Sequence, residues 1–180
     1  MIFPTRDLAH QRAVGSKVIA LLSWAIVAVA LGQSLLLGSD VIRAVLPVML
    51  LAGLQTAVWI IYRGRSLGRM LSSVLLMALV SMIVAGLSGS PYQTDMHMAY
   101  FAALAVVVIY CDWRAIIGGA ATVAVHHLVL SFVLPDLVFP GSADLGRVIF
   151  HAVILIVEAA VLAWSAARTA ASTMRMTAWK

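Results

Sequence analysis

Long runs of apolar residues, separated by short polar segments, make up most of the chain. A bilayer core needs about 20 apolar residues per helix, and six runs approach that length. We expect membrane-spanning helices near Val18–Leu37, Val41–Tyr62, Met70–Leu87, Met96–Tyr110, Ala115–Leu134 and Val148–Trp164. The fourth run is short, so we expect it to begin a few residues earlier or to be shielded by its neighbours. Because short connections pack consecutive helices antiparallel, the pattern predicts an all-α, polytopic membrane protein: a six-transmembrane-helix bundle.

The composition supports this class. Of the 180 residues, 63% are hydrophobic and 11% are charged, whereas soluble domains carry about 25% charged residues. The net charge of +5 does not indicate nucleic-acid binding, because the basic residues flank apolar runs in small groups. A single cysteine, Cys111, excludes an internal disulfide. We interpret it as a small apolar residue at a helix end rather than as a reactive thiol.

The distribution of Lys and Arg predicts the orientation. Ten of the 12 basic residues fall on one side of the predicted membrane, and only Arg43 and Arg147 fall on the other. Since Lys and Arg are enriched in cytoplasmic loops, we expect both termini to be cytoplasmic.

Three regions follow from this topology. We expect a cytoplasmic N-terminal segment at 1–17, a transmembrane domain at 18–164 and a cytoplasmic helical segment at 165–180. The N-terminal segment has no uninterrupted apolar core or adjoining cleavage site, so we interpret it as retained. The C-terminal segment is rich in helix formers and has no Gly or Pro stop. It either leads toward an output module or frays at the end of a complete protein.

Four histidines converge on the outer half of the predicted bilayer. His97 lies at the outer end of the fourth span, and His151 lies roughly 6 Å below the outer surface in the sixth. His126 and His127 lie on the order of 10–12 Å below that surface in the fifth. Glu158 follows His151 by about two helical turns and therefore shares its face.

These side chains favour a cofactor or metal site. One histidine in a span more often forms a hydrogen bond between helices, but four at similar depth with a carboxylate make a ligand site the better interpretation. Glu158 would be protonated or paired near the ligands, and Tyr100 has a polar tip that could serve one.

We consider b-type haem first and copper second. Adjacent helical residues point about 100° apart, so His126 and His127 suit neighbouring helices and one or two haems. The small residues that would leave room for a porphyrin, or serve close helix packing, are Gly118, Gly119, Ala120, Ala121 and Ala124. The alternative is copper, because Met96 and Met98 flank His97 and thioethers favour Cu(I). Zinc is less favoured, since no thiolate or carboxylate lies beside the doublet.

Two blocks resemble a known family. The blocks are "MHMAYFAALAVVVIYCDWRAI" and "VAVHHLVLSFVLPDLVFPGSADLGRVIFHAVILIVEAA", residues 96–116 and 123–160, within a match that runs over residues 96–160. They are similar to the six-helix membrane input region of bacterial methyl-accepting chemotaxis proteins and related signalling receptors. The resemblance implies a sensor in the bacterial inner membrane, usually homodimeric, with a cytoplasmic signalling module after the last helix. It implies reception rather than enzymatic catalysis.

Two further functions compete with the sensor. One is a membrane b-type cytochrome that passes electrons, and the other is a small transporter that uses histidines and Glu158 as a proton relay. Near the inner surface, we expect Asp112 to pair locally with Arg114 and Trp113 to act as an interfacial anchor.

Overall fold

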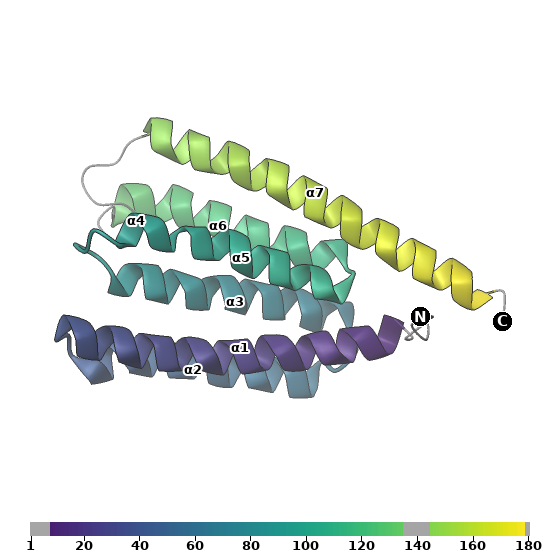
Figure 1. Ribbon diagram of the computed structural model, residues 1–180, viewed down its shortest axis with the longest axis horizontal. Coiled ribbons are helices and arrows are strands. Elements are labelled where there is room, and N and C mark those ends of the chain that lie inside the picture. Colours follow the sequence, from purple (N-terminus) through teal and green to yellow (C-terminus); the bar gives the residue numbers. More distant parts are fainter. Residues whose placement is uncertain (1–7, 135–144, 179–180) are drawn as a thin grey trace, which may run out of the picture.

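The fold is a bundle of helices (Figure 1). The computed structural model describes residues 8–134 and 145–178, and every regular element within these ranges is helical. The elements are α1 (Leu8–Leu37), α2 (Val41–Ile61), α3 (Ser66–Gly86), α4 (Gln93–Met96), α5 (Met98–Val107), the 3-10 helix η1 (Val108–Tyr110), α6 (Trp113–Val133) and α7 (Leu145–Ala178). Five of them, α1, α2, α3, α6 and the Val148–Met176 part of α7, are long and apolar enough to cross a membrane. The prediction of an all-α fold is confirmed for the described residues, as is the prediction of several helices long and apolar enough to cross a membrane.

The fourth predicted span is the exception. Its sequence is divided among α4, α5 and η1, with a break in the α-helix at His97. The segment 93–110 would extend roughly 27 Å at the rise of a continuous α-helix. Side chains along it, including Ala103, Leu104 and Val107, are buried against other helices. A segment shielded in this way does not need the long apolar surface of a lipid-facing helix, and the count of six spans stays a prediction.

Successive segments alternate in direction. The start of α1 and the end of α7 lie together at one end of the bundle, which we call the terminal end; the α4–α5 break lies toward the opposite, far end (Figure 1). α1 begins at Leu8, ten residues before the predicted span, and α7 continues as one helix through Ala178. The chain therefore remains helical from the last predicted span, which ends at Trp164, through Ala178. At 34 residues, α7 is roughly 51 Å long, which exceeds the bilayer core of about 30 Å.

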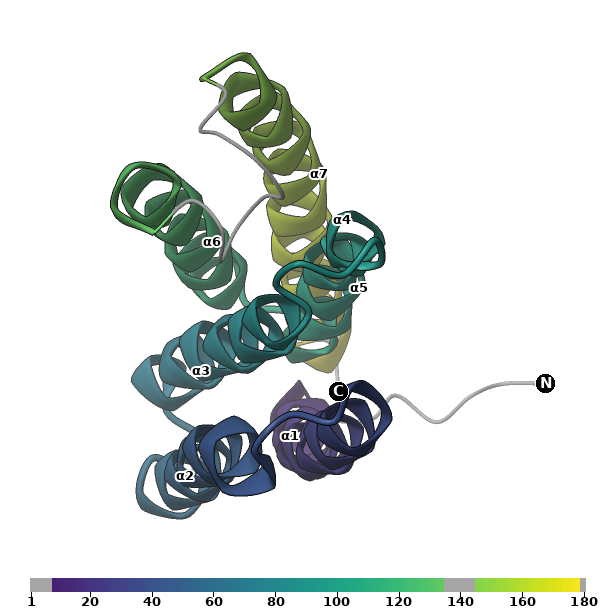
Figure 2. The same ribbon diagram turned by 90° about the vertical axis from the view of Figure 1, so that its left-hand side faces the viewer.

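α3 occupies a central position and packs against α1, α2, α5 and α6, whereas α7 packs mainly on α6 (Figure 2). Two glycines allow the close approach of α6 to α3. A Cβ on Gly119 would clash with Ser73 Oγ, and one on Gly118 would lie 2.7 Å from Met70 Cγ. Close helix packing, rather than room for a porphyrin, thus accounts for these two small residues.

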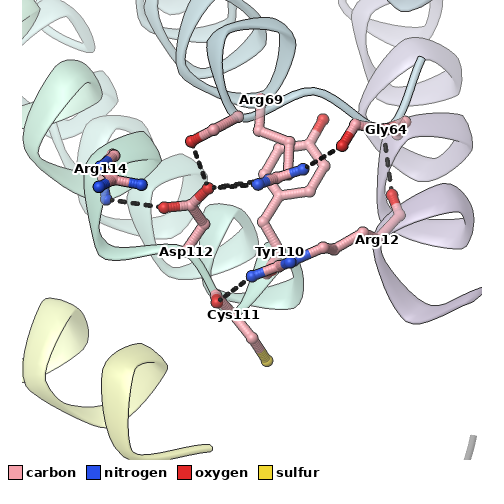
Figure 3. A network of polar contacts seen from close by, with 9 residues as sticks. Arg12, Gly64, Arg69, Tyr110, Cys111, Asp112 and Arg114 are labelled. Atoms are coloured by element: carbon pink, nitrogen blue, oxygen red, sulfur yellow. Dashed lines mark hydrogen bonds and ion pairs between the residues drawn. The ribbon is translucent and has the colours of Figure 1, made fainter. Parts of the chain in front are cut away.

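A buried ion pair joins α3 to the turn before α6. Arg69 of α3 donates to Asp112 Oδ2 from Nε at 2.9 Å and from Nη2 at 2.7 Å, and Ser66 donates to the same oxygen at 2.8 Å (Figure 3). Only 7% of Arg69 and 5% of Asp112 is exposed. The expected pairing of Asp112 with the Arg114 side chain is wrong: Asp112 Oδ1 accepts from the Arg114 backbone as the N-cap of α6, while the Arg114 guanidinium lies over the ring of Trp113. The prediction was wrong because it considered only a residue close in sequence, whereas a buried carboxylate requires a buried partner.

α1 is tied to the same turn. Arg12 donates to the carbonyl oxygens of Tyr110 and Cys111 at 3.0 and 3.1 Å (Figure 3). Gln11 donates to Cys111 Sγ at 3.1 Å. Cys111 adopts a left-handed conformation with φ of 46° and is buried. We call Gln11, Arg12, Ser66, Arg69 and the turn residues Tyr110–Asp112 the terminal-end network. It fastens α1, α3, η1 and α6 to one another.

Candidate functional site

The histidines of α6 and α7 meet the α4–α5 break toward the far end of the bundle. Ring centres lie 5.5 Å apart for His97 and His127, 6.0 Å for His97 and His151, and 6.0 Å for His127 and His151. These three rings therefore form a nearly equilateral triangle, with one residue from each of three chain segments. His126 lies beside His127 at 5.3 Å and contacts the ring of Tyr100 at 5.9 Å. The sequence-based expectation that the four histidines converge agrees with this arrangement, and their role as ligands stays a prediction.

Backbone hydrogen bonds orient two of the triangle's rings. His97 Nδ1 lies 2.9 Å from the carbonyl oxygen of Gln93, and His127 Nδ1 lies 2.9 Å from that of Val123. A carbonyl oxygen only accepts, so each Nδ1 carries the proton and donates it. In the neutral rings the basic lone pair is consequently on Nε2. An Nδ1–H held by a carbonyl is the usual outer contact of an imidazole that binds a metal through Nε2.

His126 belongs to a different hydrogen-bond chain. Ser81 Oγ donates to the Met77 carbonyl at 2.9 Å and accepts from Tyr100 Oη at 2.9 Å. Since the single phenolic proton of Tyr100 is directed at Ser81, His126 Nε2, at 3.2 Å from Tyr100 Oη, is the donor of that contact. The neutral rings of His97 and His127 thus carry the proton on Nδ1, whereas that of His126 carries it on Nε2. The adjacent histidines differ in chemistry as well as in direction.

A cavity of about 180 Å³ adjoins the triangle. His97, His127 and His151 supply polar lining together with Tyr100, and the remaining lining is Phe101, Val123, Ala124, Leu128, Val148, Ala152 and Leu155. His97, Tyr100 and His127 are almost completely buried, at 3%, 2% and 6% exposed. Pockets for organic ligands usually enclose about 300–1,000 Å³. A porphyrin does not fit this cavity unless α5, α6 and α7 separate.

The remaining predicted site residues lie outside the cavity. Glu158 Oε2 is buried and has no hydrogen-bond partner among the residues that the structure describes, but the side chain does not line the cavity. Met96 packs against two hydrophobic clusters that both include residues of α1 and α3, and Met98 is 66% exposed. Neither thioether lines the cavity with His97, so the structure does not assemble the Met-His-Met ligand set.

Sequence reasoning missed Ser81, which anchors Tyr100 from α3. A hydroxyl within an apolar run was its only signal, and Ser residues occur throughout the spans. Within residues 8–134 and 145–178, no three His, Cys, Asp or Glu side chains are arranged to hold a metal ion as they stand. Comparisons with protein families, curated proteins and solved structures find no match, so the resemblance to chemoreceptor input regions remains a prediction.

Proposed function

We propose that this chain is the transmembrane input domain of a bacterial signalling protein, with the histidine-lined cavity as its ligand site and α7 as its output element. The observation that carries the proposal is that one helix, α7, supplies both His151 at the cavity and a continuous extension to the terminal end. A ligand that contacts His151 together with His97 and His127 acts on α7 relative to α5 and α6. A ligand with such differential contacts shifts the population of helix arrangements.

The terminal-end network supports a division between a fixed part and a moving part. It joins α1, α3, η1 and α6 through hydrogen bonds from buried or half-buried side chains. α7 meets this region through apolar contacts, with Ala170 packed against Leu8 and Cys111. Apolar contacts between small side chains resist sliding less than directional hydrogen bonds do. α7 is therefore the element best suited to move against the others.

The proposed topology follows from charge. Basic residues cluster at the terminal end and in the connections on that side, so we place this end in the cytoplasm of a cell with an inner membrane. The length of α7 brings its last turns beyond the bilayer core, where they can contact a signalling module or the same helix of a second copy. In this arrangement the chain transmits a conformational change and does not catalyse a reaction.

A matched pair of α7 substitutions tests the proposal. Ala152 lines the cavity, and its neighbour Val153 is 54% exposed. In nanodiscs and in a Cys111→Ser background, spin labels at positions 63 and 172 would report the distance between the α2–α3 connection and α7, and labels at 63 and 14 would serve as the fixed reference. Ala152→Phe fills the cavity, so we expect a changed 63–172 distance distribution and an unchanged 63–14 distribution.

Val153→Phe adds a ring on the exposed face of the same turn and is expected to leave both distributions unchanged. Equal responses to the two substitutions, or none to either, would show that α7 does not report on the cavity. A change in the 63–14 reference would contradict the division between a fixed part and a moving part.

A further inference from the structure

We infer that the histidine-lined cavity binds a neutral molecule with a single aromatic ring, which enters from the lipid between α6 and α7. This inference deepens the proposed function, on which it rests for its biological role, because it names the chemical class of that cavity's ligand. The binding site itself stands on the lining of the cavity and can be tested separately.

The volume of the cavity sets the size of the ligand. At about 180 Å³, the cavity is slightly larger than an engineered apolar cavity of about 150 Å³ that binds benzene. It therefore has room for one ring with a small substituent. A bulkier part of the same molecule, such as an alkyl tail, would have to remain outside in the lipid.

The lining favours a ligand without charge. Among the described residues, no Asp, Glu, Lys or Arg lines the cavity. A charged ligand would lose its hydration without gaining an ion pair with one of these side chains, and burying an unpaired charge is costly. A neutral molecule does not incur this cost.

Rings form a large part of the cavity wall. Five of the eleven lining residues carry one: His97, Tyr100, Phe101, His127 and His151. His97 meets His127 and His151 edge to face, at interplanar angles of 69° and 70°, and Tyr100 meets His127 at 67°. Their ring centres lie 5.4 to 6.0 Å apart, within the range of about 4.5–7 Å that aromatic pairs prefer. Because the rings are steeply inclined to one another, they offer both faces and edges to a further ring.

Hydrogen bonds hold this wall in place. The Nδ1–H groups of His97 and His127 donate to main-chain carbonyls, and Tyr100 is held between Ser81 and His126. A wall that is already ordered loses little conformational freedom when a ligand binds. A rigid ring also loses less freedom on entry than a flexible lipid acyl chain would, so the cavity favours the ring.

One side of the cavity is open between α6 and α7. His97 and Tyr100 are buried, whereas Ala124 of α6 is exposed and Leu128 of the same helix is 55% exposed. Ala152 of α7, which also lines the cavity, is half-buried. In the proposed topology this side faces the outer half of the bilayer. A neutral aromatic molecule partitions into the bilayer and can reach the opening directly from the lipid.

The test uses two probes with the same reporter group, (trifluoromethyl)benzene and (trifluoromethyl)cyclohexane, which differ in the aromaticity of the ring. Fluorine NMR titrations of the purified full chain in nanodiscs would measure saturable binding, and empty nanodiscs would give the reference for partitioning. One aromatic contact is worth about two- to tenfold in affinity, so we expect one aromatic probe per chain, bound at least about fivefold tighter than the cyclohexane. Equal affinities would overturn the aromatic assignment, and saturable binding of para-(trifluoromethyl)benzoate would overturn the argument from charge.

Matched variants locate the site. Ala152→Phe fills the cavity and is expected to weaken binding of the aromatic probe by more than about tenfold, whereas Val153→Phe on the exposed face is expected to stay within about threefold. Equal losses in these two variants would overturn the location. Circular dichroism and gel filtration would establish that each variant is folded.

A second variant tests the wall itself. Phe101→Leu replaces one lining ring by an aliphatic side chain and should lower the preference for the aromatic probe by about two- to tenfold. A general loss of stability would not change this preference, because both probes share one site. An unchanged preference would overturn the role of the aromatic wall.

The results also separate the site from the proposed function. Binding of the aromatic probe without a change in the 63–172 distance would refute the proposed function and leave the binding site intact. A response of α7 to Ala152→Phe in a chain that binds neither probe would refute only the binding site. A Soret band in the purified chain would replace the aromatic ligand by haem and overturn the inference.

Discussion

Replacing Asp112 by alanine would remove the counterion of a buried arginine. Asp112 accepts two hydrogen bonds from Arg69, and the two residues are 5% and 7% exposed. Breaking a buried ion pair from one side costs about 3–5 kcal/mol, because the remaining charge is left uncompensated. Asp112 is also the N-cap of α6, and loss of such a cap typically adds about 1 kcal/mol. We therefore expect Asp112→Ala to lower the free energy of unfolding by about 4–6 kcal/mol.

Asp40 provides the matched control. It caps α2 by accepting from the backbone of Ile42 and Arg43, and its ion pair with Arg43 is 3.5 Å long. The side chains of that pair are 54% and 88% exposed, so the pair contributes at most about 1 kcal/mol. Asp40→Ala should cost the cap and little else, or about 1–2 kcal/mol. The difference between the two variants isolates the contribution of burial.

Reversible unfolding in mixed detergent and dodecyl sulfate micelles, followed by tryptophan fluorescence, would measure both changes. The double variant Arg69→Met with Asp112→Ala removes both charges, and we expect it to recover much of the loss, because apolar replacement of a buried pair is often neutral. Equal losses for Asp112→Ala and Asp40→Ala would refute the reasoning. A double variant less stable than Asp112→Ala alone would show that Arg69 acts mainly through other contacts, such as its bond to the Gly64 carbonyl.

Three other predictions use the same material. Burial alone would raise the pKa of Asp112, but hydrogen bonds from Arg69 and Ser66 together with the Arg69 charge bring that pKa below its ordinary value. The ionised carboxylate therefore stabilises the folded chain at pH values above the unfolded pKa of about 3.9. This stabilisation is lost as the pH falls through the folded pKa. Unfolding of the parent chain should therefore become easier below about pH 4, and a flat difference from Asp112→Asn across that range would contradict this. Gly119→Ala, whose Cβ would meet Ser73 and Leu104, should cost about 1–3 kcal/mol of unfolding free energy, whereas Gly53→Ala, with open space around it, should cost nothing in the same assay. For the proposed topology, a membrane-impermeant maleimide should label a cysteine at position 172 only in inverted vesicles. It should label a cysteine at position 36 only in right-side-out vesicles, and the reverse pattern would overturn the orientation.

The convergence of the histidines was predictable because it depends on two regular quantities. The predicted orientation gives each helix a direction, and a constant rise per residue converts sequence position into depth. His97, His127 and His151 therefore lie near one another, as their positions in the sequence indicate. The depth of a histidine does not show in which direction its side chain points around the helix axis, or which ring nitrogen carries the proton. The division between His126 and His127 depends on Ser81 and on main-chain carbonyls, which only the packed structure brings into contact.

The Arg69–Asp112 pair shows the opposite case. The two residues are 43 positions apart, and no local spacing relates them, so sequence reasoning selected the nearby Arg114 instead. The break at His97 was likewise not predicted, because an apolar run does not reveal where its hydrogen-bond ladder is interrupted. Hydropathy predicts which segments lie in the membrane. Long-range pairing and helix breaks are decided by packing.

Under the proposed function, the contact of Ala170 with Leu8 and Cys111 would limit the kind of motion that α7 transmits. If this contact is a pivot, His151 lies roughly 28 Å to one side of it and Ala178 roughly 12 Å to the other. A tilt that moves His151 by about half an ångström then displaces Ala178 by only about a fifth of an ångström in the opposite direction, since lever arms scale with these lengths. A rotation of α7 about its own axis, by contrast, turns both ends of the helix through the same angle. The partner that we propose at the terminal end would therefore detect a rotation of α7 about its axis more readily than a change in its tilt.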